Sequence, residues 1–132
     1  MKKDIKKSLI AQALEVRDNA YAPYSDFNVG AAVLTTDGKI YTGCNVENAS
    51  YGLSNCAERT AIYSAIADGQ QEIEAIAVVA DTAGPCSPCG ACRQVIVEFG
   101  TEIDVIMSNL KQDTVVKKAK DILWGAFKGT DF

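Results

Sequence analysis

The 132-residue sequence contains no histidine. A general acid or base must therefore be Asp, Glu, Lys, Tyr or Cys, and a zinc site must use thiolates, with or without a carboxylate. Long apolar runs are also missing: no stretch approaches the roughly 20 consecutive apolar residues of a membrane-spanning helix, and the lysine-rich start lacks the apolar run of a signal peptide. We therefore expect a cytoplasmic protein with no membrane partner.

Basic residues are the minority charge: 13 Lys and Arg stand against 17 Asp and Glu, a net charge of −4. Because electrostatic binding to nucleic acid needs a basic face, we expect no nucleic-acid partner. The length fits one domain over residues 1–132, and a hydrophobic content of 48% fills a core without disulfides. The five cysteines then point to metal binding or catalysis, which reducing compartments favour over disulfide bonds.

Hydrophobic spacing predicts alternating helices and strands. Asp37-Gly38 is typical of a hairpin turn, and Gly69 and Gly100 follow helical segments. The expected helices cover residues 4–18, 55–68 and 90–99, with a last helical turn near 121–124, and the expected strands cover 29–36, 39–45, 73–80, 103–107 and 114–117. Strands that alternate with helices favour parallel crossovers beside the hairpin. The predicted fold is α/β, a three-layer α-β-α domain with a mixed five-stranded sheet.

The residues that carry chemistry gather at two helix starts. Cys89 and Cys92 are three apart, so both sulfurs can face one point on the first turn of a helix, and Cys56 opens another helix and offers a third thiolate. Zinc with three protein ligands keeps a fourth position for water. Glu58, two residues after Cys56, is placed to accept and return a proton there. This pattern matches the zinc deaminase signature, with Cys in place of its upstream His.

Cys86 leaves a second interpretation open. With Cys89 and Cys92 it forms a C-x-x-C-x-x-C pattern, and together with Cys56 it could ligate an iron–sulfur cluster or close a structural four-cysteine zinc site. Neither of these sites would use Glu58. The prolines on either side of Cys86 also bend the chain, so the Cys86 side chain need not face the metal. Cys44 lies in an apolar strand, where we expect a thiol of the core.

The chain resembles the homotetrameric cytidine deaminases of the zinc-dependent cytidine and deoxycytidylate deaminase family across nearly its whole length. Besides the two cysteine motifs, residues 24–31 (YSDFNVGA) look like the family's entry into its first strand, and residues 45–52 (NVENASYG) are similar to its nucleoside-binding segment. The resemblance implies one Zn²⁺ per chain, a nucleoside substrate and self-association as a homotetramer. It also implies that the Arg59 guanidinium hydrogen-bonds ligand sulfurs, where the alternative is a surface ion pair.

The same resemblance assigns the substrate contacts. Asn45 and Glu47 would hold the ribose 3′-hydroxyl, Phe27 would pack on the sugar and base, and the Ala57 backbone N–H would meet the pyrimidine 2-carbonyl. Two aromatic residues, Tyr51 and Phe127, would enter the active site of a neighbouring subunit. Without the resemblance, Phe27 and Phe127 fit equally well as core or interface aromatics, Asn45 as a strand end and Glu47 as a solvated loop acid. Trp124 stands where the family often has proline, which bears on the placement of Phe127.

The implied reaction is the hydrolytic deamination of cytidine and deoxycytidine to uridine and deoxyuridine, with release of ammonia, as in pyrimidine salvage. Glu58 would carry protons to ring N3 and to the leaving amino group. A nucleoside-like antibiotic such as blasticidin S is the alternative substrate within the same fold. The segment 45–52 favours ribose recognition over the antibiotic.

Overall fold

The computed structural model describes residues 2–132, and the helices and strands follow the predicted order. The elements are α1 (Lys3–Arg17), β1 (Val29–Thr35), β2 (Ile40–Cys44), α2 (Ala57–Ala67), β3 (Ile73–Ala80), α3 (Gly90–Phe99), β4 (Asp104–Asn109) and β5 (Val115–Lys118), with short 3-10 turns at Tyr51–Leu53, Ala119–Asp121 and Gly129–Asp131. No helix within residues 2–132 has the length and apolar content that crossing a bilayer requires.

The last helical turn differs from the prediction, which put it near 121–124; the structure has it at Ala119–Asp121. The physical reason is the anchoring of its first residue. Ala119 is fully buried and its N–H donates to the Ile103 carbonyl at 2.9 Å, so the turn begins directly after β5. The chain then reverses at Gly125, which has a φ of 68°.

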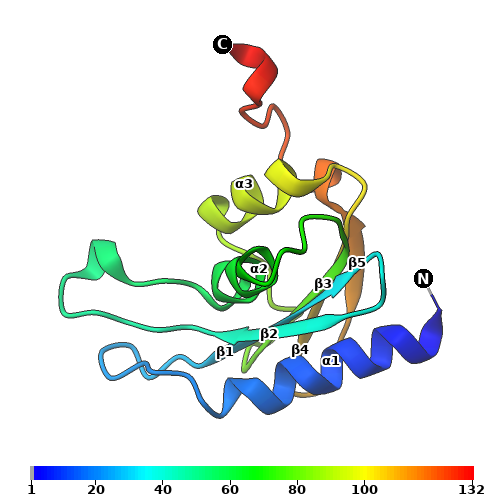
Figure 1. The fold of residues 1–132 in the computed structure, drawn as a ribbon. Coiled ribbons are helices and arrows are strands. Elements are labelled where there is room, and N and C mark those ends of the chain that lie inside the picture. Colours follow the sequence, from blue (N-terminus) through cyan, green and yellow to red (C-terminus); the bar gives the residue numbers. More distant parts are fainter. Residues whose placement is uncertain (1) are drawn as a thin grey trace.

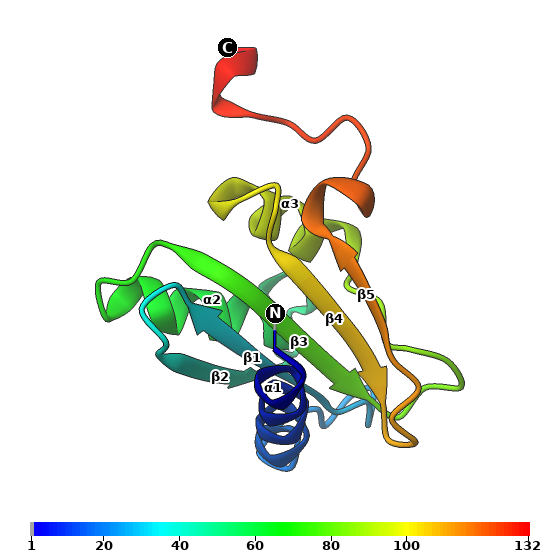
Figure 2. The ribbon, with the colours of Figure 1, turned by 90° about the vertical axis from the view of Figure 1, so that its right-hand side faces the viewer.

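The sheet has the strand order β2-β1-β3-β4-β5. β1 is antiparallel to both neighbours, β3 and β4 are parallel, and β5 is antiparallel to β4. The strands β2, β3 and β4 therefore run in one direction, and α2 and α3 are the crossovers between them. Helix α1 covers one face of the sheet, and α2 and α3 cover the other (Figures 1 and 2). The predicted three-layer mixed sheet is confirmed.

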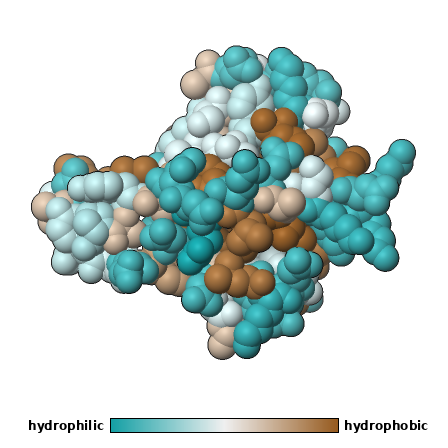
Figure 3. Space-filling view, turned by 90° about the horizontal axis from the view of Figure 1, so that it is seen from below, coloured by the Kyte–Doolittle hydropathy of each residue, from teal (hydrophilic) through white to brown (hydrophobic). Residues whose placement is uncertain are grey.

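Each face of the sheet has its own hydrophobic core. On the α1 face, Leu9 and Ala13 pack on residues of β1, β3 and β4; the exposed surface on this side mixes hydrophilic and hydrophobic groups (Figure 3). On the opposite face, Ala61 and Ile62 of α2 and Ile96 of α3 pack on the sheet. The spacing of these residues makes both helices amphipathic enough to bury one side.

A glycine brings α2 close to the sheet. A Cβ at Gly43 of β2 would lie 2.4 Å from the Ala61 backbone nitrogen, so no larger residue fits without moving the helix. This close approach places the first turn of α2 beside the end of β2. The start of α2, which follows Cys56, therefore lies at the end of the sheet where β1 begins and β2 ends.

Candidate active site

Three cysteines from the starts of two helices meet at this end of the sheet. Cys56 immediately precedes α2, Cys89 immediately precedes α3, and Cys92 lies in the first turn of α3. Their sulfurs all lie within 4.8 Å of one another, and the Sγ atoms of Cys56 and Cys89 are 3.7 Å apart. Tetrahedral zinc with Zn–S bonds of about 2.3 Å separates two ligand sulfurs by about 3.8 Å. The donor set and its spacing therefore fit one zinc ion.

Hydrogen bonds stabilise the thiolate form of Cys56. The Arg59 Nη2 donates to the Cys56 Sγ at 3.3 Å. Hydrogen bonds from the Cys92 thiol, first, and from the Arg59 guanidinium lower the pKa of Cys56 to about 5. Arg59 Nε is buried without a hydrogen-bond partner among residues 2–132. The guanidinium thus lies against the sulfur of a candidate ligand, and within the described residues it forms no surface ion pair.

Glu58 is the buried acid of the site. It lies in the first turn of α2 with 4% of its surface exposed. Burial, assisted by the negative charge of Cys56, raises the pKa of the Glu58 carboxyl to about 7. A carboxyl group with this pKa can both accept and release a proton near neutral pH.

The cluster and the acid share one pocket of about 180 Å³. Six predicted site residues line it: Phe27, Asn45, Cys56, Ala57, Glu58 and Cys89. Cys92 is fully buried behind them. The pocket also includes Cys86, the fourth cysteine of the alternative interpretation, and Val29 and Ser87, which the sequence did not single out. A strand start and a loop before a proline carry no distinctive chemical signal, so only the fold brings them here.

Asn45 organises the pocket wall through its side-chain amide. Its Oδ1 accepts from the Val29 backbone N–H at 2.8 Å, and its Nδ2 donates to the Phe27 carbonyl at 2.7 Å. The two bonds fix the chain on both sides of Asn28 where it enters β1. Phe27 is thereby held at the pocket with 42% of its surface exposed.

Glu47 and Tyr51 lie in a neighbouring hollow, together with Tyr24, Ser25 and Ser54. The Glu47 carboxylate accepts from the backbone N–H groups of Tyr24 and Ser25 at 3.0 and 3.1 Å, and from the Ser25 hydroxyl. The Ser25 hydroxyl, followed by these backbone bonds, lowers the pKa of Glu47. The acid therefore orders the turn that precedes Phe27.

Phe127 does not line the cysteine pocket of its own chain. It lies in the C-terminal tail beside α3, and a separate hollow includes it with Val97 and Glu98. Of the two remaining cysteines, Cys86 lines the pocket but stands outside the three-sulfur cluster of the described residues. Cys44 is half-buried on β2 and also lies outside that cluster.

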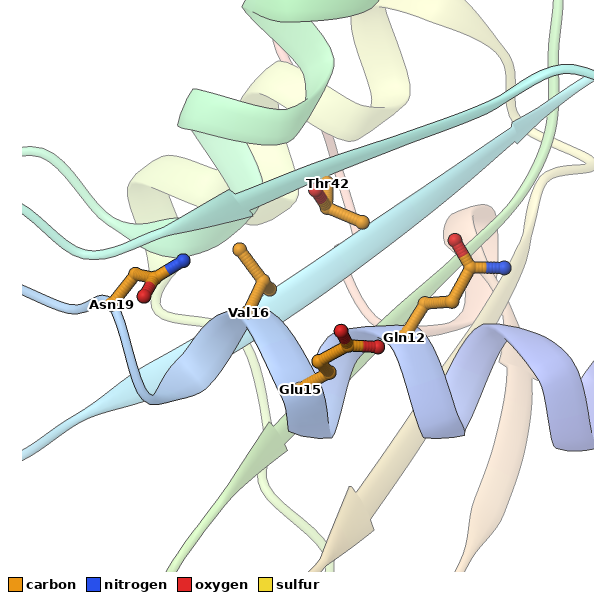
Figure 4. Close-up of a pocket in the computed structure, with 5 residues that line it drawn as sticks. All are labelled: Gln12, Glu15, Val16, Asn19 and Thr42. Atoms are coloured by element: carbon orange, nitrogen blue, oxygen red, sulfur yellow. The ribbon is translucent and has the colours of Figure 1, made fainter.

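A further hollow lies on the opposite helical layer. Gln12, Glu15, Val16 and Asn19 of α1 and its C-terminal end line it with Thr42 of β2 (Figure 4). None of the predicted site residues belongs to it, and its lining is mostly polar. This hollow therefore has no part in the site predicted from the sequence.

Comparisons with known proteins agree with this geometry. Residues 3–108 match the family model described as the cytidine and deoxycytidylate deaminase zinc-binding region. The chain is 53% identical over 129 residues to a cytidine deaminase of Sporosarcina psychrophila, covering 97% of this chain and 94% of that protein, and 49% identical over 127 residues to one of Halalkalibacterium halodurans, covering 96% of each. The crystal structure of cytidine deaminase from Burkholderia pseudomallei superposes with a TM-score of 0.91 at 54% identity, covering 96% of this chain and all of that one. With its cysteine cluster, buried glutamate and three-layer sheet, the chain belongs to the zinc-dependent cytidine and deoxycytidylate deaminase family.

Proposed function

We propose that this chain catalyses the zinc-dependent hydrolytic deamination of cytidine and deoxycytidine, which yields uridine or deoxyuridine and ammonia. The observation that carries the proposal is the buried Glu58 carboxyl in one pocket with Cys56 and Cys89 of the three-cysteine cluster. The substrate follows from relatives about half identical over nearly the full length, which are named cytidine deaminases. We place the activity in pyrimidine salvage in the cytoplasm.

Cys56, Cys89 and Cys92 would hold the zinc ion, which supplies Lewis-acid activation of the attacking water when bound. Three thiolates outweigh the charge of one Zn²⁺ and weaken its acidity. The Arg59 guanidinium withdraws part of that negative charge through its hydrogen bond to Cys56.

Glu58 carries the protons of the reaction. The carboxylate takes a proton from water as oxygen attacks C4 and delivers it to ring N3. Glu58 then takes the proton of the hydroxyl added at C4 and delivers it to the amino group, so that ammonia leaves and the C4 carbonyl forms. Because burial brings the pKa of Glu58 to about 7, both the protonated and the ionised carboxyl are populated near neutral pH.

The pocket wall supplies the substrate contacts. Ala57 is the first residue of α2, so its N–H has no acceptor within the helix and is free for the pyrimidine 2-carbonyl. Phe27 offers an apolar face to the sugar and base, and Asn45 and Glu47 are polar groups at the ribose end. A contact with the 3′-hydroxyl serves ribose and deoxyribose alike.

We also propose a homotetramer whose subunits complete one another's sites. The pocket of about 180 Å³ is smaller than the roughly 300–1,000 Å³ of typical small-molecule sites. Tyr51 and Phe127 are 74% and 62% exposed and contribute no wall to the pocket of their own chain. In a closed assembly each copy donates both rings to a neighbour.

Ammonia release from a panel of substrates tests the proposal. The panel is cytidine, deoxycytidine, adenosine and blasticidin S, each with the zinc-loaded protein. We expect turnover of the first two alone. Turnover of blasticidin S with cytidine left intact would replace the nucleoside by the antibiotic, and ammonia from none of the four would refute the activity.

A further inference from the structure

The C-terminal tail runs past the outside of α3 and then projects from the domain (Figures 1 and 2). Ile122, Leu123 and Ala126 pack partly against the core. The aromatic residues of the tail do not: Trp124 is 97% exposed and Phe132 91% exposed. Burial against the core therefore contributes little to the placement of the Trp124 and Phe132 rings.

Two neighbouring side chains of α3 hold the tail by hydrogen bonds. Arg93 donates from Nη1 to the Ile122 carbonyl at 2.7 Å and from Nε to the Pro88 carbonyl at 2.8 Å. The Gln94 Nε2 donates to the Phe127 carbonyl at 2.7 Å, and the Gln94 Oε1 accepts from the Phe127 N–H at 3.2 Å. The tail is thus fixed at both ends of the segment 122–127.

The pairing at Phe127 requires a primary amide of this length. A peptide unit presents one N–H and one C=O at each residue, and a side-chain amide is the group that satisfies both at once. A glutamate keeps the acceptor but sets a carboxylate against the Phe127 carbonyl. Asparagine carries the same amide on a side chain one methylene shorter, so Gln94 is the fitting residue at this position.

We propose that Gln94 is a positioning residue that fixes the Phe127 backbone so that its ring reaches the substrate. The inference rests on the proposed role of Phe127 at a neighbouring subunit's site, and it adds the group that sets where the ring lies. Gln94 acts only through Phe127. It lies on α3 two residues after Cys92, so the same helix start positions a metal ligand and the tail.

The test compares Gln94→Ala and Gln94→Glu with Gln71→Ala, a change at an exposed glutamine before β3. Two readouts are measured on the zinc-loaded protein: steady-state kinetics with cytidine, and the rate at which trypsin cuts after Lys128, the residue following Phe127. We expect both Gln94 variants to raise KM about tenfold with kcat within about twofold of wild type, because two hydrogen bonds to the binding residue are lost. Cleavage after Lys128 should accelerate in both, zinc content should stay at one per chain, and Gln71→Ala should match wild type.

Phe127→Ala separates this inference from the proposed function. If Phe127→Ala raises KM while the Gln94 variants change neither KM nor cleavage after Lys128, Gln94 does not position the ring, and the role of Phe127 stands. If the Gln94 variants speed cleavage but Phe127→Ala leaves KM at the wild-type value, the proposed role of Phe127 is wrong, and the inference fails with it. Should Gln94→Ala not fold, Gln94→Glu alone decides, since it preserves side-chain size.

Discussion

The Arg59 guanidinium donates to the Cys56 sulfur across 3.3 Å, one helical turn along α2. This contact links a permanent positive charge to one of three thiolates that would otherwise donate fully to the metal. In the proposed mechanism, this contact lets an all-cysteine site keep a bound zinc ion acidic.

Replacing Arg59 should therefore reduce turnover. We expect Arg59→Ala to lower kcat about 10- to 100-fold, the usual cost of losing a partner of a metal ligand. Arg59→Lys keeps the charge without the planar fork and should lose less. Kinetics and elemental analysis on the same preparations check this, and full turnover in Arg59→Ala would show that the contact does not tune the site.

The metal content of cysteine variants distinguishes the open site from a four-cysteine site. Cys89→Ala and Cys92→Ala should lose zinc, because each removes one of three converging sulfurs. Cys86→Ser and Cys44→Ser should keep one zinc per chain by elemental analysis. Equal loss of zinc in Cys86→Ser and Cys89→Ala would favour the four-cysteine interpretation.

Glu58→Gln tests the proton carrier. The amide has nearly the same shape but cannot accept and return a proton, so kcat should fall at least about 10²- to 10⁴-fold. Zinc content and the far-ultraviolet circular dichroism spectrum should match wild type. Deamination at a near-normal rate would remove Glu58 from the mechanism.

Phe127→Ala and Glu58→Gln together test donation between subunits. Phe127→Ala should raise the KM for cytidine. It should leave the melting temperature close to that of wild type, because the ring is 62% exposed in its own chain. Chains carrying Glu58→Gln, mixed and reassembled with Phe127→Ala chains, should regain activity, since some sites then combine an intact Glu58 with a donated Phe127. Light scattering that shows an active monomer of this chain would contradict the shared site.

Gly43→Ala should destabilise the fold. Its Cβ would meet the Ala61 nitrogen at 2.4 Å, which forces α2 away from β2 at a cost of about 1–3 kcal/mol in the free energy of unfolding. Gly84→Ala is the matched control, because its Cβ would meet nothing within 4 Å. Urea unfolding of both variants gives the comparison, and equal midpoints would show that α2 can shift freely.

The sequence predicted most of the fold because local signals agreed with the final packing. Asp37-Gly38 lies between β1 and β2, and Gly69 and Gly100 follow α2 and α3, as expected. The turn at Ala119 was placed too late because its anchor, the Ile103 carbonyl, is distant in the sequence. A contact of that kind leaves no local pattern.

The features of the site fall into the same two groups: those with a local sequence signal and those that depend on distant contacts. Cys89 and Cys92 were identifiable as candidate ligands because their three-residue spacing is local to the chain, and Cys56 because it opens a second helix. The amide of Asn45 bonding on both sides of Asn28, and the amide of Gln94 bonding Phe127, depend on backbone groups brought near by the fold. A sequence pattern names the residue type at such positions but not the peptide group it will meet.

The direction of the strands has a practical consequence for engineering. The elements that build the pocket meet at one end of the strands: β1 starts there, β2 ends there, and α2 and α3 begin there. The connections at Asp37-Gly38, after Gly69 and after Gly100 all lie at the opposite end of the strands, where β1 ends and β2, β3 and β4 start. Exposed turns with small residues tolerate inserted sequence best. A peptide tag or reporter grafted at Asp37-Gly38 is therefore separated from the cysteine pocket by the full length of β1. The same graft between Ser50 and Ser54 falls at the hollow that Tyr51 and Ser54 line with Glu47.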